Sequence, residues 1–510
     1  MGSELRGAEL VFGLVAPLGT PLDPIESALR ESLASHGYET APTIRISALL
    51  AQDVELSERP EVRRQRLMEV GNQLRASRGG DHLAKLAIAA AHAWRRGNAN
   101  PGPAVKTAQV IRALKHPDEV ALLRAVYGNG FFLIGSSAPR SERRQRLIDQ
   151  NFPRSEAERL LDKDSGERLN FGQQTRETFQ HADVYLRVGP SAAAELARFV
   201  DLVMSHPFLS PTAEEFAMYL AYAASLRSSD LSRQVGAVVV NDQGDVIATG
   251  ANDVPSAGGG PYWPTRPDGP AKPPAAGPDH ARGFDSNERE RNRIIGGIIR
   301  ALTDDGGSDD HELVAKYREA LEPTGVLDLT EFGRAVHAEM AALLACARAG
   351  ARPKGGTLYC TTFPCHNCTK HIVEAGLKRV VYVEPYPKSK ARDLHDDAIA
   401  IVDEEVLPLE LHDTRVKFET FVGVGARRFV DLFSMTLGSG RPVRRKQRGG
   451  DGARVAWERG RDSAPRLALD PRSYLEHETA VAGTLLDSDQ GDGKVGNGEG
   501  GQSCPQEVAT

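Results

Sequence analysis

His-Ala-Glu at residues 337–339 is followed, 25 residues later, by Pro-Cys-His-Asn-Cys at residues 364–368, and these two stretches decide the fold around them. One imidazole and two thiolates can hold three tetrahedral positions of Zn²⁺, and a catalytic zinc leaves its fourth position open for water. His337, Cys365 and Cys368 are therefore the candidate ligands of one Zn²⁺ ion.

The residues around both stretches predict a framework that would hold such a site. Residues 338–349 are rich in Ala and Leu and predict a helix that begins directly after His337, while residues 357–361 are typical of a β-strand. Cys365 and Cys368 then open a second helix, whose N-terminal N–H groups favour a thiolate over a thiol. Two helix starts behind a sheet would form a compact three-ligand site.

A Cys-x-x-Cys pair by itself has a plainer interpretation, as a redox pair or as half of a structural zinc site. A structural site would need a fourth ligand, for which His366 or His371 is available. Cys346 and Cys360 are expected to be small buried residues, and Cys504 lies in the C-terminal tail. The His-x-Glu stretch, at its distance from the cysteines, favours the catalytic interpretation.

Taken together, the two stretches resemble the His-x-Glu…Pro-Cys-x-x-Cys signature of the zinc nucleobase deaminases. This resemblance implies that the metal lowers the pKa of a bound water and that Glu339 is the catalytic acid and base. Glu339 would take the proton of the water and deliver it to the pyrimidine N3 and to the departing amine. Residues 211–435 are similar to the deoxycytidylate deaminase branch, which implies a cytidine-deaminase-like α/β/α zinc domain.

Three residues are candidates for substrate binding. Asn252 matches an Asn that binds the sugar in that branch, although an Asn at this place also suits a turn. Tyr386 and Lys388 follow a strand-like run and could stack a base and neutralise a phosphate, although a solvated basic loop has the same composition. Arg233, just before the first strand of the domain, is a weaker candidate for a phosphate contact.

The N-terminal part predicts a separate α/β domain over residues 1–195. Residues 10–15, 108–112 and 131–135 are apolar runs typical of strands, and segments of helical spacing lie between them. Strands that alternate with helices favour a mostly parallel sheet. The fold class is therefore α/β for both halves of the chain.

The loop after the first of these strands resembles a phosphate-binding loop that has lost its lysine. A working P-loop needs a lysine after its last glycine to reach the β- and γ-phosphates, and Thr20 stands at that place. We therefore expect no kinase activity from this domain. The loop could still receive a nucleotide or another anion through Gly13, Gly19 and Thr20.

The whole arrangement resembles bacterial phage-defence deoxycytidine nucleotide deaminases, in which a P-loop-kinase-like domain precedes the deaminase domain. The resemblance implies conversion of dCTP and dCMP to dUTP and dUMP, which depletes dCTP during infection. It also implies a homo-oligomer and control by a regulatory nucleotide or a small inhibitory RNA. Residues 255–283, rich in Pro and Gly, are expected to form a flexible insertion, and residues 438–510 a disordered tail.

Composition narrows the classes of function. The chain has 510 residues, a formal charge of −6 and 6% aromatic residues, so we expect neither a general attraction to nucleic acid nor a base-stacking platform. There is no apolar run of membrane-spanning length and no signal-peptide pattern, which predicts a soluble cytoplasmic protein without a membrane partner.

Three alternatives stay open at this point. One is a polynucleotide deaminase acting on tRNA or single-stranded DNA, supported by the basic run at residues 441–448. Another is a housekeeping deoxycytidylate deaminase that supplies dUMP. The third is a non-enzymatic module with structural zinc, which would have no use for Glu339.

Overall fold

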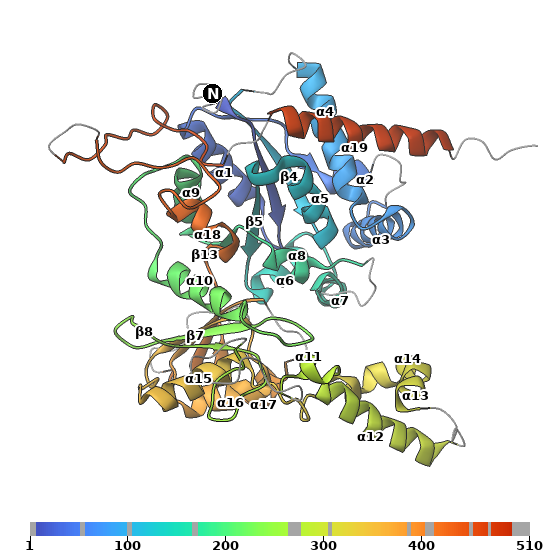
Figure 1. Ribbon diagram of the computed structural model, residues 1–510. Helices are drawn as coiled ribbons and strands as arrows, with labels where there is room; N and C mark the ends of the chain where they lie inside the picture. The colour runs from blue at the N-terminus through green and yellow to red at the C-terminus, as the bar shows by residue number, and fades with distance from the viewer. Residues whose placement is uncertain are drawn as a thin grey trace, which may run out of the picture.

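The computed structural model describes residues 7–51, 57–98, 105–165, 172–263, 277–303, 309–384, 389–402, 413–447, 452–467 and 471–491. Two β-sheets organise these residues, one above the other in Figure 1, and helix α10 (Ala213–Ser225) lies between them. No helix among the described residues has both the length and the apolar character needed to cross a bilayer.

The first sheet has seven strands, and its four central strands are parallel. In spatial order these are β4 (Thr107–Leu114), β1 (Leu10–Val15), β5 (Phe131–Ser137) and β6 (Val184–Arg187). At the edges lie β2 (Glu39–Thr40) and β3 (Ile44–Arg45), which pair with β4, and β13 (Gly423–Val424), which is antiparallel to β6. The three strands that we predicted for this domain are confirmed.

Successive side chains of the first sheet enter two different apolar layers, because neighbouring residues of a strand point to opposite faces. Val11 and Val15 pack with helices α4 (His82–Asn98) and α5 (Pro117–Tyr127). Phe12 and Leu14 pack on the other face with α1 (Asp23–Ser35) and α9 (Ala192–Val203). Since α9 belongs to this layer, the first domain continues past the predicted end at residue 195.

A third apolar group covers the carboxyl ends of the central strands. Leu18, in the loop between β1 and α1, packs there against helices α3 (Pro60–Arg78), α6 (Arg140–Asp149) and α7 (Arg154–Ser165). The short helices complete the framework: α2 (Ile46–Leu50), α8 (Thr175–Gln180) and, beside the second sheet, α17 (Ala391–Leu394).

The second sheet has six strands and is covered on both faces. Its order is β11 (Ile399–Ile401), β12 (Val416–Thr420), β10 (Arg379–Glu384), β9 (Thr357–Thr362), β7 (Gly236–Val240) and β8 (Val246–Ala251). Helix α10 packs on one face, and α15 (Ala338–Ala349) and α16 (His366–Glu374) pack on the other. The predicted helices after His337 and Cys365 therefore both exist and share one face.

Two glycines let helices approach this sheet closely. A Cβ atom on Gly236 would lie 1.9 Å from the carbonyl oxygen of Ala221 in α10, and a Cβ atom on Gly250 would lie 2.1 Å from that of Ala338 in α15. A side chain at either place would push the helix away from the sheet. Gly250 therefore sets the depth of α15, the helix that begins with the candidate site.

A helical arm, which we did not predict, follows the Pro- and Gly-rich segment. It consists of α11 (Asp279–Arg282), α12 (Ser286–Leu302), α13 (Asp310–Lys316) and α14 (Arg318–Leu321), and it projects from the second sheet in Figure 1. Ile295 and Ile299 of α12 pack on Leu313 and Val314 of α13. Of the predicted insertion at 255–283, residues 264–276 lie outside the described residues.

The prediction of a disordered tail is wrong for residues 438–447, 452–467 and helix α19 (Pro471–Gly491). Val443 and Leu467 are buried, and α19 lies across α4 (Figure 1). Val443 and Leu467 are isolated apolar residues in segments rich in Gly and Arg, so the sequence has no hydrophobic periodicity that would predict their burial. The preceding β13 and α18 (Ala426–Phe433) also join the first domain, although we had assigned them to the second. Residues 492–510 lie outside the described residues.

A buried ionic cluster fixes α19 to the first domain. Arg95 donates from Nη2 to Glu9 Oε1 at 2.8 Å and from Nη1 to Glu478. The hydroxyl of Tyr127 donates to Glu478 Oε1 at 2.6 Å, and that of Tyr474 donates to Glu9 Oε2 at 2.7 Å. All five residues are buried. The charge of Arg95 is therefore compensated from both ends of the chain.

Replacing Glu478 by Ala should lower the free energy of unfolding by about 3 kcal/mol, because it removes an ion-pair partner of the buried Arg95 and leaves the Tyr127 hydroxyl without its acceptor. Glu476, on the same helix, is exposed, so Glu476→Ala should change stability by about 0.5 kcal/mol or less. The midpoint of urea unfolding, followed by circular dichroism, compares the two variants with the wild type. Equal midpoints for all three would contradict the packing of α19.

Candidate metal centre and active site

The candidate ligands come from the starts of two helices on one face of the second sheet. His337 is the residue before α15, and its extended backbone turns the chain into the helix. Cys365 holds the same place before α16, and Cys368 lies in the first turn of that helix. His337 Nδ1 lies 3.3 Å from Cys365 Sγ and 3.4 Å from Cys368 Sγ. The three predicted ligands are therefore brought together.

The donor set and its spacing fit a zinc ion. All three donor atoms lie within 4.8 Å of one another. Tetrahedral zinc, with its usual bonds to nitrogen and sulfur, places such atoms about 3.6 Å apart, close to the distances observed here. Within the described residues no fourth His, Cys, Asp or Glu joins the group. Three protein ligands beside a cavity are the arrangement of a catalytic rather than a structural zinc.

Hydrogen bonds among the three donor groups shift their pKa values. Hydrogen bonding from Cys368 and from His337 lowers the pKa of Cys365 to about 3. The hydrogen bond to Cys365 raises the pKa of His337 to about 9. The hydrogen bond between Cys368 and Cys365, together with burial, raises the pKa of Cys368 well above its ordinary value. One thiolate is thus already formed, which suits a cation ligand.

Glu339 lies beside these donors. It occupies the first turn of α15, is only 4% exposed, and its Oε2 accepts from Cys368 Sγ at 3.5 Å. Burial raises the pKa of its carboxyl group, and the neighbouring Cys365 thiolate adds to the effect. The carboxylate is therefore close enough to the metal position to exchange a proton with a group bound there.

A cavity of about 540 Å³ opens over the donor atoms, within the size range of small-ligand pockets. His337, Glu339 and Cys365 lie in its wall together with Asn252. The helical arm forms part of its wall. Three arginines, Arg233, Arg291 and Arg334, line the cavity among six acidic side chains, and Arg334 Nη1 pairs with Asp279 Oδ1 at 2.6 Å. Arg291 comes from α12 and Arg334 from the segment that precedes His337.

The three substrate-binding candidates have different outcomes. Asn252 lines the cavity, but its carboxamide also fixes the backbone, because Oδ1 accepts from Val235 N at 2.7 Å and Nδ2 donates to Arg233 O at 2.8 Å. One lone pair and one N–H of this group are left for a ligand. Tyr386 and Lys388 lie outside the described residues.

The remaining predicted residues belong to the first domain. Gly13 lies inside β1, where a Cβ atom would be 2.8 Å from the side chains of Leu114 and Phe131. It packs inside the strand and is not among the residues that line the cavity beside Gly19 and Thr20, so its role in an anion loop stays a prediction. Gly19 and Thr20 lie in the loop after β1 and line a second cavity.

The sequence analysis did not predict Arg291 and Arg334 as cavity residues, because no sequence pattern indicates that the segments carrying them lie near the zinc ligands. The helix that carries Arg291 does have a signal, since Asp285 caps it and its isoleucines recur at helical spacing. That signal predicts a helix over residues 286–302, but it does not predict that this helix borders the cavity over the zinc ligands.

Replacing Cys365 by Ala should reduce bound zinc from about one ion per chain to a small fraction, because two ligands hold zinc far more weakly than three. Cys346, buried in α15 without a place in the donor group, provides the matched control. Cys346→Ala should retain its zinc. Metal content measured by mass spectrometry after gel filtration compares the variants; full zinc in Cys365→Ala would exclude this metal centre.

Residues 211–384 match the family model described as the cytidine and deoxycytidylate deaminase zinc-binding region. The chain is 31% identical over 173 residues to the deoxycytidylate deaminase of Enterobacteria phage T2, which is 34% of this chain and 80% of that protein. It is 25% identical over 169 residues to the human deoxycytidylate deaminase, covering 33% and 63%.

Among solved structures, the dCMP deaminase of cyanophage S-TIM5 in complex with dCMP and dUMP is similar at 22% identity and a TM-score of 0.23, over 42% of this chain and 99% of that one. The sequence match and the His337, Cys365 and Cys368 site together decide the assignment. This chain belongs to the cytidine and deoxycytidylate deaminase family, whose members are zinc-dependent hydrolases that act on nucleotides.

Proposed function

We propose that this enzyme hydrolyses the exocyclic amine of deoxycytidine nucleotides, converting dCTP, dCMP or both to dUTP or dUMP with release of ammonia. The observation that carries the proposal is the buried Glu339 carboxylate, which lies against the three zinc ligands in the wall of a nucleotide-sized cavity. An acid and base group at this place serves a reaction, whereas a structural zinc has no use for one.

The chain's own residues account for the proton movements. Zinc, when bound, supplies Lewis-acid activation of water. Glu339 would accept a proton from the attacking water at its carboxylate and donate it to N3 of the pyrimidine. It would then take the proton of the new C4 hydroxyl and pass it to the amine, which leaves as ammonia when the C–N bond breaks. Burial of Glu339 keeps bulk water from competing for these transfers. The imidazole and the two thiolates hold the reacting centre within reach of the carboxylate.

Three arginines, which lie among acidic side chains in the wall of the cavity, are the support for a phosphorylated substrate. Arg233 lies close enough to His337 for its charge to act on that imidazole, and Arg291 and Arg334 face the same space. We assign the phosphates of the substrate to these arginines and the sugar to Asn252. Tyr386 and Lys388 complete the proposal from the sequence, as contacts to the base and a phosphate.

The structure gives less support to a polynucleotide substrate. None of the described residues of the basic run at 441–448 lines the zinc cavity. Arg445, for example, donates to the carbonyl oxygen of Pro207 at the first domain.

We also propose that the activity serves antiviral defence, by depleting dCTP in an infected cell. The support is the fusion of a deaminase domain to a P-loop-like domain without its lysine, an arrangement that suits control rather than housekeeping supply of dUMP. Assembly into a homo-oligomer and restraint by a regulatory nucleotide or a small RNA stay predictions.

Replacing Glu339 by Gln should lower kcat/KM for deamination by about 10³-fold while zinc content stays at the wild-type level, because the amide cannot carry the proton. Glu374, exposed at the end of α16, is the matched control, and Glu374→Gln should keep wild-type activity. Ammonia release, measured alongside metal content, separates loss of chemistry from loss of zinc. Wild-type turnover by Glu339→Gln would remove the proposed acid and base.

The substrate class is tested by incubating the purified enzyme with dCTP, dCMP, CTP and a single-stranded DNA oligonucleotide. We expect deamination of at least one deoxycytidine nucleotide and none of the polymer; the reverse result would establish the polynucleotide alternative. In infected cells, the wild-type chain should lower dCTP and restrict phage growth, and Glu339→Gln should do neither. Unchanged dCTP with the wild type would contradict the defence role.

A further inference from the structure

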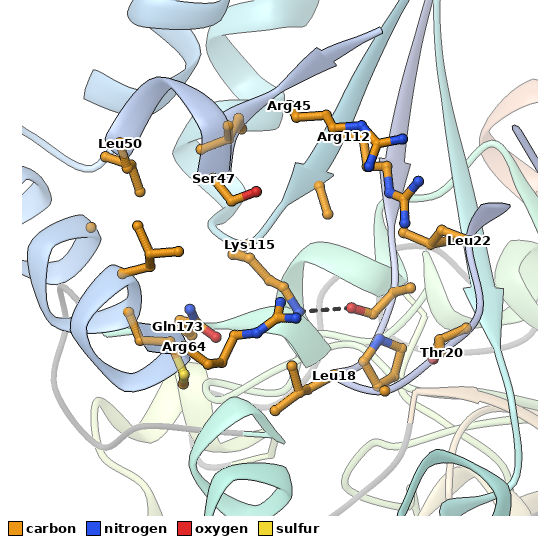
Figure 2. A pocket seen from close by; sticks show the side chains of 18 of the residues that line it. Leu18, Thr20, Leu22, Arg45, Ser47, Leu50, Arg64, Arg112, Lys115 and Gln173 are labelled. Atoms are coloured by element: carbon orange, nitrogen blue, oxygen red, sulfur yellow. Dashed lines mark hydrogen bonds between the residues drawn. The ribbon is translucent and has the colours of Figure 1, made fainter. Parts of the chain in front are cut away.

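A second cavity, of about 330 Å³, lies at the carboxyl end of the first sheet, in the domain that does not contain the zinc ligands (Figure 2). Its wall is formed by the loop between β1 and α1, by Arg45 and the start of α2, by helix α3, and by the residues that follow β4. In parallel α/β sheets this edge, next to the first strand, is where ligands bind. Nothing in the deaminase chemistry uses this space.

Lys115 takes the place of the lysine that the loop lacks. β1 and β4 are parallel neighbours, so the residue after β4 emerges beside the loop that follows β1. Lys115 Nζ donates to Ala16 O at 2.8 Å, as Figure 2 shows, and to Asp164 Oδ1 at 2.6 Å. Asp164 Oδ2 also accepts from Leu18 N at 2.6 Å and so ties the loop to Lys115. An ammonium group has three protons, which leaves one for a ligand.

Arg64 adds a second cation at the same point. It reaches from α3 into the cavity toward Lys115 in Figure 2, and none of the described residues accepts a hydrogen bond from it. Burial, together with its cationic neighbours Arg112 and Arg63, lowers the pKa of this guanidinium despite the attraction of Asp164. A partly buried cation without an acceptor is stabilised by an anion from solution.

The charge balance of the cavity also favours an anionic ligand. Six cationic side chains line it, and Asp23 is the only carboxylate among the lining residues. Three further carboxylates pair with lining cations from behind: Glu26 with Arg112, Glu119 with Arg75, and Asp164 with Lys115. Six positive groups therefore face four negative groups.

A buried hydroxyl provides an independent sign of a missing partner. Thr20 is 9% exposed, and its Oγ1 has no hydrogen-bond partner among the described residues. Thr20 lines the cavity next to Gly19, whose φ of +84° turns the loop. A hydroxyl taken out of water is satisfied when a ligand oxygen reaches it.

Part of the cavity wall is apolar. Leu50 of α2, Leu67 and Met68 of α3 and Leu83 of α4 line it. A ligand that suits both the cationic and the apolar lining has an anionic end and a less polar end. We propose that this cavity binds a nucleotide, with its phosphates at Lys115, Arg64 and Thr20 and its nucleoside on the leucine-rich wall. This inference is independent of the proposed deaminase function.

Isothermal titration calorimetry on the full chain tests the site, with ATP, GTP and UTP as probes because none carries the cytosine amine that the zinc site would recognise. At least one of them should bind to the wild type. Arg64→Gln should weaken that binding at least tenfold and the near-isosteric Thr20→Val about fivefold. Arg66→Gln, an exposed cation on the same helix, should stay within twofold.

The thermal unfolding temperature and the zinc content of each variant are measured as controls. Values equal to those of the wild type show that the variant is folded. Tripolyphosphate should bind at least fivefold more weakly than the nucleotide, because it cannot use the apolar wall. No binding of any probe to the wild type, wild-type affinity in both Arg64→Gln and Thr20→Val, or equal affinity for tripolyphosphate would each overturn the assignment.

Discussion

The convergence of two helix starts on one point is the constraint on which the deaminase domain depends. His337 precedes α15 and Cys365 precedes α16, and both helices must lie on the same face of the second sheet at a fixed depth for their side chains to meet within 3.4 Å. The missing side chain of Gly250 sets that depth for α15. The same placement puts Glu339, two residues after His337 in the first turn of α15, beside the donors and out of water.

The two halves of the chain use the same principle for different ends. In both, residues that follow parallel strands or begin helices gather at one edge of a sheet, where backbone ends leave room for a ligand. At the second sheet these residues are soft donors and a carboxylate, which suit a metal and proton transfer. At the first sheet they are cations and a hydroxyl, which suit phosphate. The chemistry differs because the side chains differ, while the scaffolds are alike.

Much of this organisation is predictable from local pattern. Local sequence pattern predicted the strands β1, β4, β5 and β9, because a buried strand needs continuous or alternating apolar side chains. The zinc ligands were predictable because their residue types and spacing are unusual. The helical arm and the folded tail were not predicted. Helix α19 of the tail is held by a few side chains, such as Tyr474 and Glu478, whose hydrogen-bond partners lie hundreds of residues away in the sequence.

The sequence by itself determined the metal ligands, the presence of Glu339 beside them and the α/β class of both halves, and it shows that Thr20, not a lysine, follows Gly19. Only the tertiary structure decided that Lys115 emerges next to that loop, that Gly13 is buried in a strand, and that Arg291 faces the zinc cavity. The physical reason for this difference is the separation in sequence between the residues that form each site. A motif of adjacent residues carries its geometry with it, whereas the partner of a residue across a sheet or cavity is chosen by how the elements pack.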